Sequence, residues 1–201
     1  MTSVTISPKQ ISELRTRTSA GMMDCKKALE EAGGDMDKAA EILRKKGIAK
    51  AEKRAGRVAA QGVVVSYIHH NGQVGVLLEL NSETDFVART EAFQQLARDI
   101  ALHVASADPI GVTPEDIPAE VLERERRIAE ERVAAEGKPE NVRAKIVEGK
   151  LKKFVAERTL TEQPYVKDDS KTVGQLIKEV SGKVGEAVHV RRFTRFKIGE
   201  A

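Results

Sequence analysis

A β-hairpin signal near residue 70 constrains the fold of this chain more than any other feature of the sequence. Residues 63–80, VVVSYIHHNGQVGVLLEL, form two β-rich runs around Asn71-Gly72, a dipeptide typical of tight hairpin turns. Larger aliphatic residues occupy alternate positions of the second run: Val74, Val76, Leu78 and Leu80. Because side chains alternate between the two faces of a strand, this pattern predicts one buried face. Residues 187–198, AVHVRRFTRFKI, are the natural third strand, and their imperfect alternation allows a bulge.

The segment after the hairpin predicts a long amphipathic helix. Its apolar residues recur at the helical spacing i, i+3, i+4, i+7: Phe93, Leu96, Ala97, Ile100, Ala101 and Val104. Thr90 is a plausible N-terminal cap. His103 falls outside the apolar stripe and is expected to be an exposed or partly buried polar residue. One face of this helix is therefore expected in the core.

The second half of the chain is helical and highly charged. Residues 119–137 and 139–160 each combine a thin apolar stripe with many charges. They predict a projecting antiparallel pair of helices joined by Gly137-Lys138-Pro139, with the second helix interrupted at Gly149. TEQPYVKDDS then predicts a loop, and KTVGQLIKEVSGKVG predicts a short helix.

The N-terminal fifty residues predict three short helices. SPKQ, beginning at Ser7, is a capping-box pattern with proline at the first helical position. Asp35 is expected to cap the third helix, and Gly47 is expected to end it. Residues 49–62, AKAEKRAGRVAAQG, follow as a basic connecting helix or linker. Together with the hairpin and the C-terminal strand, these helices favour an α+β fold.

Composition excludes several classes of protein. The formal net charge is +3, too small to indicate general nucleic-acid binding by charge alone. The one cysteine, Cys25, excludes an internal disulfide and fits a reducing compartment. The first ten residues lack the apolar region of a secretory signal, and no apolar run is long enough to cross a membrane. These features predict a soluble cytoplasmic protein.

No site in the sequence is typical of an enzyme, a metal centre or a nucleotide pocket. His69 and His70 are adjacent in a strand and point to opposite faces, so they cannot share a metal ion. Cys25 lies on a helical face and is expected to be a small core residue rather than a nucleophile. Gly182-Lys183 lacks the preceding glycine and the following Ser or Thr of a phosphate-binding loop. We therefore expect no catalysis, no metal, no cofactor and no direct nucleotide binding.

Three stretches carry a resemblance to a known family. They are LRTRTSAGMMDCKKALEEAGGDMDKAAEILRKKG, NSETDFVAR, and EQPYVKDD followed by GEAVHVRRFTRF. In this order they resemble elongation factor Ts, the bacterial nucleotide-exchange factor of translation elongation factor Tu, over essentially the whole chain. The resemblance implies an α+β fold that opens with a partner-binding three-helix bundle, residues 1–55, like that of ubiquitin-associated domains. A linker then leads to a core for dimerisation and exchange, residues 56–201, with a three-stranded antiparallel sheet and a charged helical excursion at about 109–164.

The resemblance also implies a function and the residues that perform it. The chain looks like a guanine-nucleotide exchange factor that binds elongation factor Tu in its GDP-bound and nucleotide-free states. The positions that match the family's motif are Thr84, Asp85, Phe86 and Val87. Phe86 is implied to wedge between two partner helices and to disturb the groups that hold Mg²⁺ and the β-phosphate. A second partner contact is implied for Arg15, Met22 and Met23. Longer relatives have two core halves and this chain has one, so a homodimer is expected.

The residues themselves leave alternatives open. Taken alone, the residues favour Phe86 as a core residue under the first helical turn, with Thr84 or Asp85 as the cap, because most phenylalanines are buried. Met22 could pack inward against Cys25. The basic stretch at residues 45–57 suits a nucleic-acid-binding protein of the translation machinery, although aromatic residues are not interleaved with its charges. An enzyme would need a perturbed acid–base or metal site, which the sequence does not suggest. Neither DNA nor a membrane is an expected partner.

Overall fold

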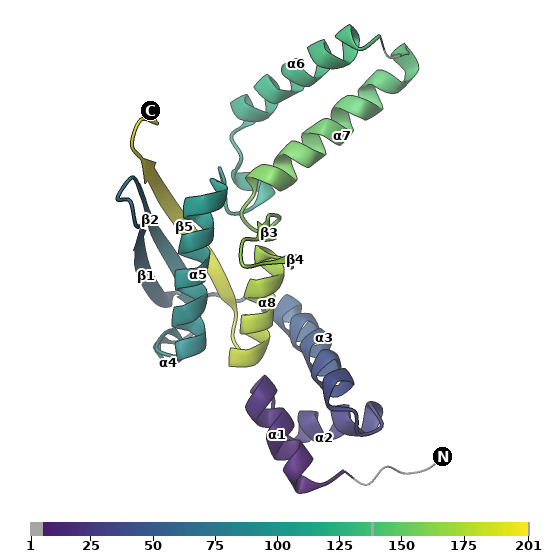
Figure 1. Cartoon of the computed structure of the whole chain (residues 1–201), viewed down its shortest axis with the longest axis vertical. Helices are drawn as coiled ribbons and strands as arrows, with labels where there is room; N and C mark the ends of the chain where they lie inside the picture. The colour runs from purple at the N-terminus through teal and green to yellow at the C-terminus, as the bar shows by residue number, and fades with distance from the viewer. Residues whose placement is uncertain (1–5, 138, 201) are drawn as a thin grey trace. The chain divides into compact units, whose positions relative to one another are not determined.

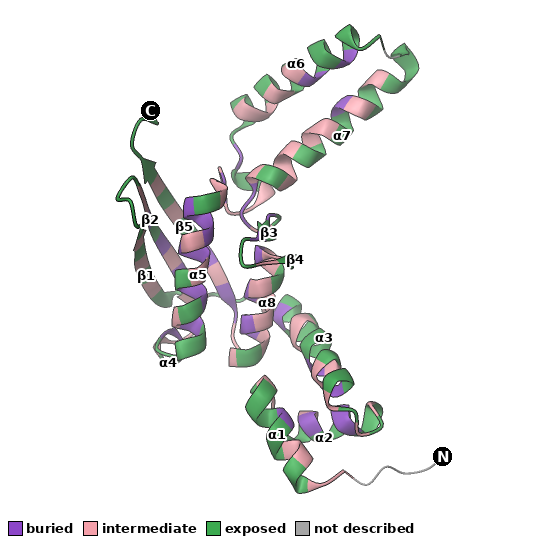
Figure 2. Ribbon diagram, viewed as in Figure 1, coloured by how far each residue is buried: buried purple, intermediate pink, exposed green. Residues whose placement is uncertain are grey.

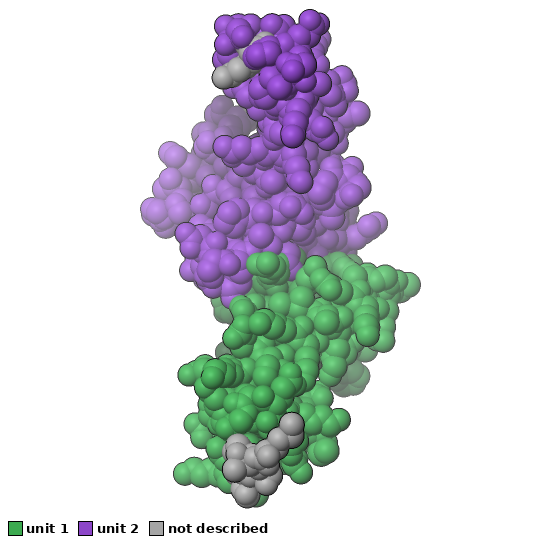
Figure 3. Space-filling view, turned by 90° about the vertical axis from the view of Figure 1, so that its right-hand side faces the viewer, with its two compact units in different colours: residues 1–63, 80–96, 175–189 green, residues 64–79, 97–174, 190–201 purple. Residues whose placement is uncertain are grey.

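The computed structural model describes residues 6–137 and 139–200. Lys138, in the predicted turn between the charged helices, lies outside the described residues. So do residues 1–5, which belong to the N-terminal segment considered above as a signal sequence. The chain divides into two compact units (Figure 3). Unit 1 comprises residues 1–63, 80–96 and 175–189, and unit 2 comprises residues 64–79, 97–174 and 190–201.

The predicted three-stranded sheet is confirmed. Within the described part of the chain, β1 (Gln61–Ile68), β2 (Val74–Ser82) and β5 (Val188–Lys197) form an antiparallel sheet in the order β1-β2-β5 (Figure 1). β1 and β2 make the expected hairpin, in which the His69 N–H donates to the Val74 carbonyl oxygen at 2.8 Å. Gly72 turns the chain with a φ of 68°, a conformation that favours glycine. The buried face of β2 is the predicted one, with Val76, Leu78 and Leu80 buried.

The long amphipathic helix is α5 (Glu91–Ala107), and every residue of its predicted apolar stripe is buried. Thr90 caps it as expected, because its hydroxyl oxygen accepts a hydrogen bond from the Phe93 N–H at 3.4 Å. In unit 2, the Arg195 side chain of β5 donates to the carbonyl oxygen of Ala105. The C-terminal strand therefore lies beside the end of α5.

The N-terminal bundle of unit 1 consists of α1 (Pro8–Thr18), α2 (Met22–Glu31) and α3 (Met36–Arg54). Its core is a cluster of small and medium apolar side chains: Leu14, Cys25, Ala28, Leu29, Ala39 and Leu43. The capping box at Ser7 is present, and the Asp35 carboxylate accepts the first free N–H groups of α3 at 3.0 Å. Cys25 is a buried free thiol, so its predicted packing role is confirmed.

The prediction that Gly47 ends the third helix is wrong. α3 continues through Gly47 to Arg54, so the first part of the basic segment is helix rather than linker. The reason is a helix crossing: Gly47 lies against Gly182 of α8 (Val173–Val184). A glycine allows this close backbone approach, and the packing offsets its low helix propensity. An ion pair between Lys178 and Glu52, at 2.8 Å, further joins α8 to the end of α3.

The charged helices form the predicted antiparallel pair in unit 2, α6 (Ala119–Ala135) and α7 (Glu140–Arg158) (Figure 1). A short apolar cluster of Ala129, Val133 and Val147 joins them. Figure 2 shows that buried residues are few along this pair and that its outer faces are exposed. The expected interruption at Gly149 is wrong, because α7 is continuous there. A single glycine costs only about 1 kcal/mol in a helix interior, which does not break a helix supported by a partner.

The segment TEQPYVKDDS is predicted to be a loop, but it contains two short strands. β3 (Pro164–Tyr165) pairs antiparallel with β4 (Asp168–Thr172). β3 has only two residues, and the five residues of β4, DDSKT, are all polar, so neither shows the alternation that predicts a strand. The proline-punctuated loop before α6 contains the 3₁₀ turn η1 (Pro114–Asp116).

His103 is buried, at 1% exposed, rather than exposed or partly buried. Its Nδ1 accepts from the Val166 N–H at 3.2 Å, so its Nε2 donates to the Gln163 side-chain oxygen at 2.9 Å. Gln163 in turn donates to the carbonyl oxygens of Ala107 and Glu157. This network satisfies an imidazole in the interior of unit 2, and burial lowers the pKa of His103 below its usual 6.5.

Among the described residues, no helix is both long enough and apolar enough to cross a membrane.

Candidate functional site

The junction that follows β2 is a single helical turn, α4 (Asp85–Ala88). Thr84 is its N-cap, because the Thr84 hydroxyl oxygen accepts from the Val87 N–H at 3.4 Å. Asp85 does not cap the turn, and its carboxylate instead accepts from the Arg89 guanidinium at 2.8 Å. This ion pair faces solvent, so it contributes little to stability. The local structure of the motif is therefore set by Thr84.

Phe86 projects from α4 into solvent. It is 79% exposed, whereas Val87 and Ala88 on the same turn are buried. The alternative in which Phe86 is a core residue is therefore wrong. Burying a phenylalanine is worth about 1.5–3 kcal/mol, and Phe86 gives up most of that contribution to folding. α4 therefore exposes the large, stiff side chain of Phe86, while the buried side chains of Val87 and Ala88 hold the turn in place.

The N-terminal candidates are also on the surface. Met22 and Met23 begin α2 and are 52% and 64% exposed, and Arg15 is exposed in the last turn of α1. The alternative in which Met22 packs inward with Cys25 is wrong. Cys25 lies in the bundle core, and the two methionines face solvent at the N-terminus of the same helix. Flexible thioethers in this position suit an adaptable protein interface.

The two candidate surfaces belong to the same compact unit. Residues 1–63 and 80–96 both lie in unit 1, so Met22 and Phe86 are parts of one unit. α2 packs on α3 through the apolar core of the bundle, and two half-exposed ion pairs also link the helices, with Lys50 and Asp24 2.9 Å apart and Lys46 and Glu31 2.6 Å apart. These pairs involve two of the six cations in the basic stretch at residues 45–57.

Sequence reasoning missed two carboxylates behind α4. Glu186 accepts hydrogen bonds from the Thr84 main-chain N–H and from its hydroxyl, at 3.0 and 2.7 Å. Glu83 accepts from the Ala187 N–H at 2.7 Å, and this bond, with the nearby Arg57 charge, holds the pKa of Glu83 below its usual value. Glu186 lies in the stretch GEAVHVRRFTRF, but nothing in the sequence shows that this stretch folds back onto Thr84.

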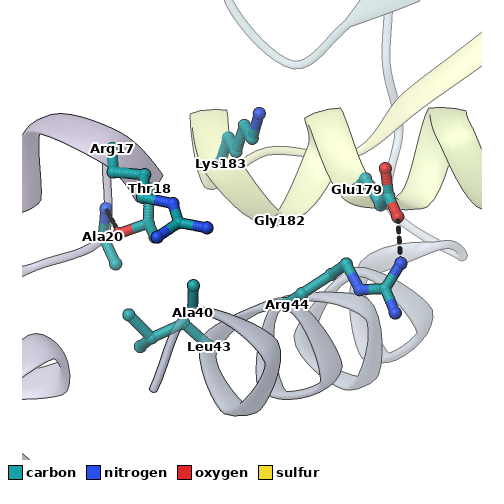
Figure 4. A pocket seen from close by; sticks show the side chains of 10 residues that line it. Arg17, Thr18, Ala20, Ala40, Leu43, Arg44, Glu179, Gly182 and Lys183 are labelled. Carbon is teal, nitrogen blue, oxygen red and sulfur yellow. Dashed lines mark hydrogen bonds and ion pairs between the residues drawn. The ribbon is translucent and has the colours of Figure 1, made fainter. Parts of the chain in front are cut away.

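Unit 1 also contains a cavity of about 210 Å³ between α1, α3 and α8 (Figure 4). Its lining contains both charged side chains and small apolar residues. The lining residues are Arg17, Thr18, Ala20, Ala40, Leu43, Arg44, Gly47, Glu179, Gly182 and Lys183. Two of the cations are paired, Arg44 with Glu179 at 3.4 Å and Arg17 with Asp37 at 2.7 Å. No sequence motif indicates this cavity.

In residues 6–137 and 139–200, no group of three or more His, Cys, Asp or Glu side chains could hold a metal ion. Gly182, considered as part of a phosphate-binding loop, lies inside α8 at its crossing with α3. Its role in the structure is close packing.

Comparison with known proteins agrees with the sequence motifs. The family model described as "Elongation factor TS" matches residues 8–200. Over 195 residues, or 97% of this chain, the sequence is 55% identical to elongation factor Ts of Carboxydothermus hydrogenoformans, covering 90% of that protein. It is 56% identical to elongation factor Ts of Thermotoga maritima and 55% identical to that of Thermosipho melanesiensis, covering 97% and 100% of those proteins.

Proposed function

The chain belongs to the elongation factor Ts family of translation factors, and we propose that it is a guanine-nucleotide exchange factor for elongation factor Tu. The observation that carries the proposal is the exposure of Phe86 on a turn whose next two residues, Val87 and Ala88, are buried. A stiff apolar side chain held in solvent by buried neighbours is suited to displacing groups on a folded partner. The factor works in protein biosynthesis and itself catalyses no chemical step.

Phe86 enters the GTPase domain of the partner beside its nucleotide. There it displaces the groups that hold Mg²⁺ and the β-phosphate. Mg²⁺ requires nearly ideal octahedral geometry, so a small displacement of its ligands costs much affinity. Once the metal leaves, the charge of the diphosphate is no longer compensated, and GDP dissociates. Phenylalanine suits this role because its stiff side chain loses little conformational freedom on binding.

Exchange also sets a thermodynamic requirement on the factor. It binds nucleotide-free elongation factor Tu more tightly than the GDP-bound form, since only differential affinity shifts the equilibrium. By linkage, GDP weakens the binding of the factor by the same ratio. Thr84, Asp85 and Val87 assist by holding or flanking Phe86 at this contact.

Arg15, Met22 and Met23 form the second contact with the GTPase domain. Their exposure at one end of the bundle supports this role. Two contacts on one compact unit bind cooperatively, because the first contact raises the effective concentration of the second. The functional division into a partner-binding bundle at residues 1–55 and an exchange core at residues 56–201 is part of the proposal.

The factor acts in the cytoplasm as a homodimer. The outer face of the sheet in unit 2 supports the dimer, because it exposes large apolar side chains on strands or next to them: Val64, Ile68, Leu77, Phe196 and Ile198. Ile68 also lies across from Gly75, whose added Cβ would be 3.1 Å from the Ile68 Cδ1 atom. Several large apolar side chains exposed on one face of a sheet are typical of a protein interface.

The alternative of a nucleic-acid-binding protein gains no support. Four of the six cations in the basic stretch at residues 45–57 are paired with carboxylates: Lys45 with Glu41, Lys46 with Glu31, Lys50 with Asp24, and Arg57 with Glu83. A phosphate backbone would have to compete with each of these acids.

Release of labelled GDP from elongation factor Tu tests the proposal. The purified chain should accelerate release, and excess Mg²⁺ should oppose the acceleration because it favours the metal-bound state. A release rate that does not change with the concentration of the chain would refute the proposed function.

A further inference from the structure

The turn that carries Phe86 is held from behind by a carboxylate that is far away in the sequence. Glu186 and Thr84 are 102 residues apart, and both belong to unit 1. Glu186 Oε2 accepts from the Thr84 main-chain N–H at 3.0 Å, and Glu186 Oε1 accepts from the Thr84 hydroxyl at 2.7 Å. One side chain thus satisfies both donors of the residue that caps α4.

Glu186 is itself fixed in position. α8 ends at Val184, and Gly185 reverses the chain with a φ of 79°. The Ser181 hydroxyl then donates to the Glu186 carbonyl oxygen. These contacts leave the Glu186 main chain little freedom, so its carboxylate is a defined anchor for Thr84.

A second carboxylate, that of Glu83, makes the reciprocal contact from the segment before α4 to the segment after α8. Glu83 accepts from the Ala187 N–H at 2.7 Å, while Glu186 accepts from Thr84. The Ser82 hydroxyl also donates to the Thr84 carbonyl oxygen at 2.9 Å. Hydrogen bonds from side chains of both segments therefore join residues 82–84 to residues 186–187. We call these bonds the clasp, and they end at Thr84, the residue before α4.

The Thr84 hydroxyl links this clasp to the helical turn. It donates to Glu186 and at the same time accepts from the Val87 N–H, so the carboxylate selects the rotamer in which Thr84 caps α4. A helix of four residues is too short to be stable alone, because nucleation is unfavourable. Its shape, and with it the direction of Phe86, depends on such tertiary contacts.

We propose that Glu186 is a positioning residue for nucleotide exchange, whose carboxylate locks Thr84 so that α4 presents Phe86 in one orientation. The inference rests on the proposed function of Phe86 as the group that enters the partner. A preordered probe loses less conformational entropy on binding than a mobile one. Glu186 therefore acts through Phe86 and does not itself contact the nucleotide site.

A double-mutant cycle between Glu186→Ala and Phe86→Ala tests this role, with the maximal rate of labelled-GDP release at saturating factor as the readout. Glu186→Ala should slow release roughly tenfold or more, the effect expected for losing hydrogen bonds to a charged group. In the Phe86→Ala background it should slow release no further, because residues that act as a unit are not additive. Glu186→Gln keeps one acceptor oxygen and should fall between Glu186→Ala and the parent. Equal fold losses in the two backgrounds would overturn the proposal.

Glu41→Gln is the matched charge control. Glu41 pairs with Lys45 at 2.7 Å on the surface of α3, in the same unit, and touches neither α4 nor its clasp. This variant removes one carboxylate charge and should release GDP at the parent rate. A loss equal to that of Glu186→Gln would mean that charge, not positioning, is responsible, and would overturn the proposal.

Hydrogen–deuterium exchange of the free protein gives a readout that needs no partner. In Glu186→Ala, amide exchange should accelerate in residues 83–88 and stay unchanged in α3 and α5. Unchanged exchange in residues 83–88, or faster exchange throughout unit 1, would overturn the positioning role. If the parent chain itself does not accelerate GDP release, the proposed function fails and the role of Glu186 in exchange falls with it. If the parent and Phe86→Ala behave as proposed while Glu186→Ala matches the parent, only the inference fails.

Discussion

Gly182 of α8 packs directly against the backbone of Gly47 in α3. A Cβ atom added to Gly182 would lie 2.8 Å from the Gly47 carbonyl carbon and 2.9 Å from its Cα atom. Real side chains do not approach a backbone this closely, so the two helices can cross here only with glycine at position 182. The crossing joins the last helix of the bundle to α8, which leads to Glu186.

Gly182→Ala should therefore destabilise the protein. The methyl group forces α3 and α8 apart, and overpacking of this kind costs about 1–3 kcal/mol. Urea unfolding should show a lower midpoint for the variant than for the parent.

Gly149→Ala is the matched control for that experiment. Gly149 is also inside a helix, but an added Cβ would meet nothing within 4 Å. It should gain about 1 kcal/mol from the better helix propensity of alanine. If Gly182→Ala is as stable as Gly149→Ala, the close crossing does not exist in solution.

Because His103 is buried, we expect the free energy of unfolding to fall in acid. The buried ring is neutral, and its pKa in the folded protein lies below 6.5 because burial disfavours the charged form. Between the two pKa values the unfolded chain binds more protons than the folded one. Stability is therefore full above about pH 6.5 and falls as the pH is lowered toward the folded-state pKa, by about 1.4 kcal/mol for each unit of pKa difference.

Urea midpoints measured from about pH 8 to about pH 5 check this expectation. The parent should lose stability with acid more steeply than His103→Gln, which has no imidazole to protonate. Equal slopes for the two proteins would show that His103 does not set the acid response.

The open sheet face predicts a dimer that depends on apolar contacts. Light scattering at micromolar concentration should give twice the 22.0 kDa mass of one chain. Leu77→Glu puts a charge in the middle strand of the face and should shift the protein to monomer. Reducing agent should have no effect, because the one cysteine, Cys25, is buried.

Val58→Glu is the control for the dimer. Val58 is exposed but belongs to unit 1, outside the sheet face, so its variant should keep the parent mass. A parent mass of one chain, or a dimer that survives Leu77→Glu, would exclude association through this face.

The methionines at the start of α2 predict a binding defect without a folding defect. The double variant Met22→Ala/Met23→Ala removes exposed side chains, so its melting temperature should change little. Its affinity for nucleotide-free elongation factor Tu should fall roughly tenfold, equivalent to about 1.4 kcal/mol. Met36→Ala, which removes a side chain packed on the bundle core, should instead lower the melting temperature. Parent affinity of the double variant, measured by titration calorimetry, would remove this second contact from the account.

The elements with strong local patterns were predictable from the sequence. α5 shows its buried stripe directly, because six apolar residues repeat at helical spacing and all are buried. The hairpin follows from Asn71-Gly72, and the α1 capping box follows from Ser7 and Gln10. The position of Phe86 required more: residues alone favoured burial, and only the family resemblance indicated a projecting side chain.

The features that the sequence did not predict depend on distant partners. Gly47 is a helix end by local rules, and it continues a helix because Gly182 packs on it. His103 lies off its own apolar stripe, yet Gln163 and Val166 cover it and satisfy both ring nitrogens. The Glu186 contact with Thr84 likewise joins residues that share no periodic pattern. In each case tertiary packing overrides a local preference.

Because Phe86 is exposed, its role in exchange can be tested without a change in the stability of the fold. Phe86→Ala should leave stability within about 0.5 kcal/mol of the parent, as is usual for a surface change. Phe93, which is completely buried at the start of α5, is the internal control. Phe93→Ala should cost about 3–5 kcal/mol, because it removes core volume and leaves a cavity.

Whether Phe86 drives exchange is decided by labelled-GDP release from elongation factor Tu, measured with Phe86→Ala and the parent at equal concentrations of folded protein. Phe86→Ala should melt with the parent and release GDP roughly tenfold more slowly or worse, a loss of at least about 1.4 kcal/mol in the exchange transition state. Release at the parent rate, or a melting temperature as low as that of Phe93→Ala, would show that Phe86 is not the exposed side chain that drives exchange.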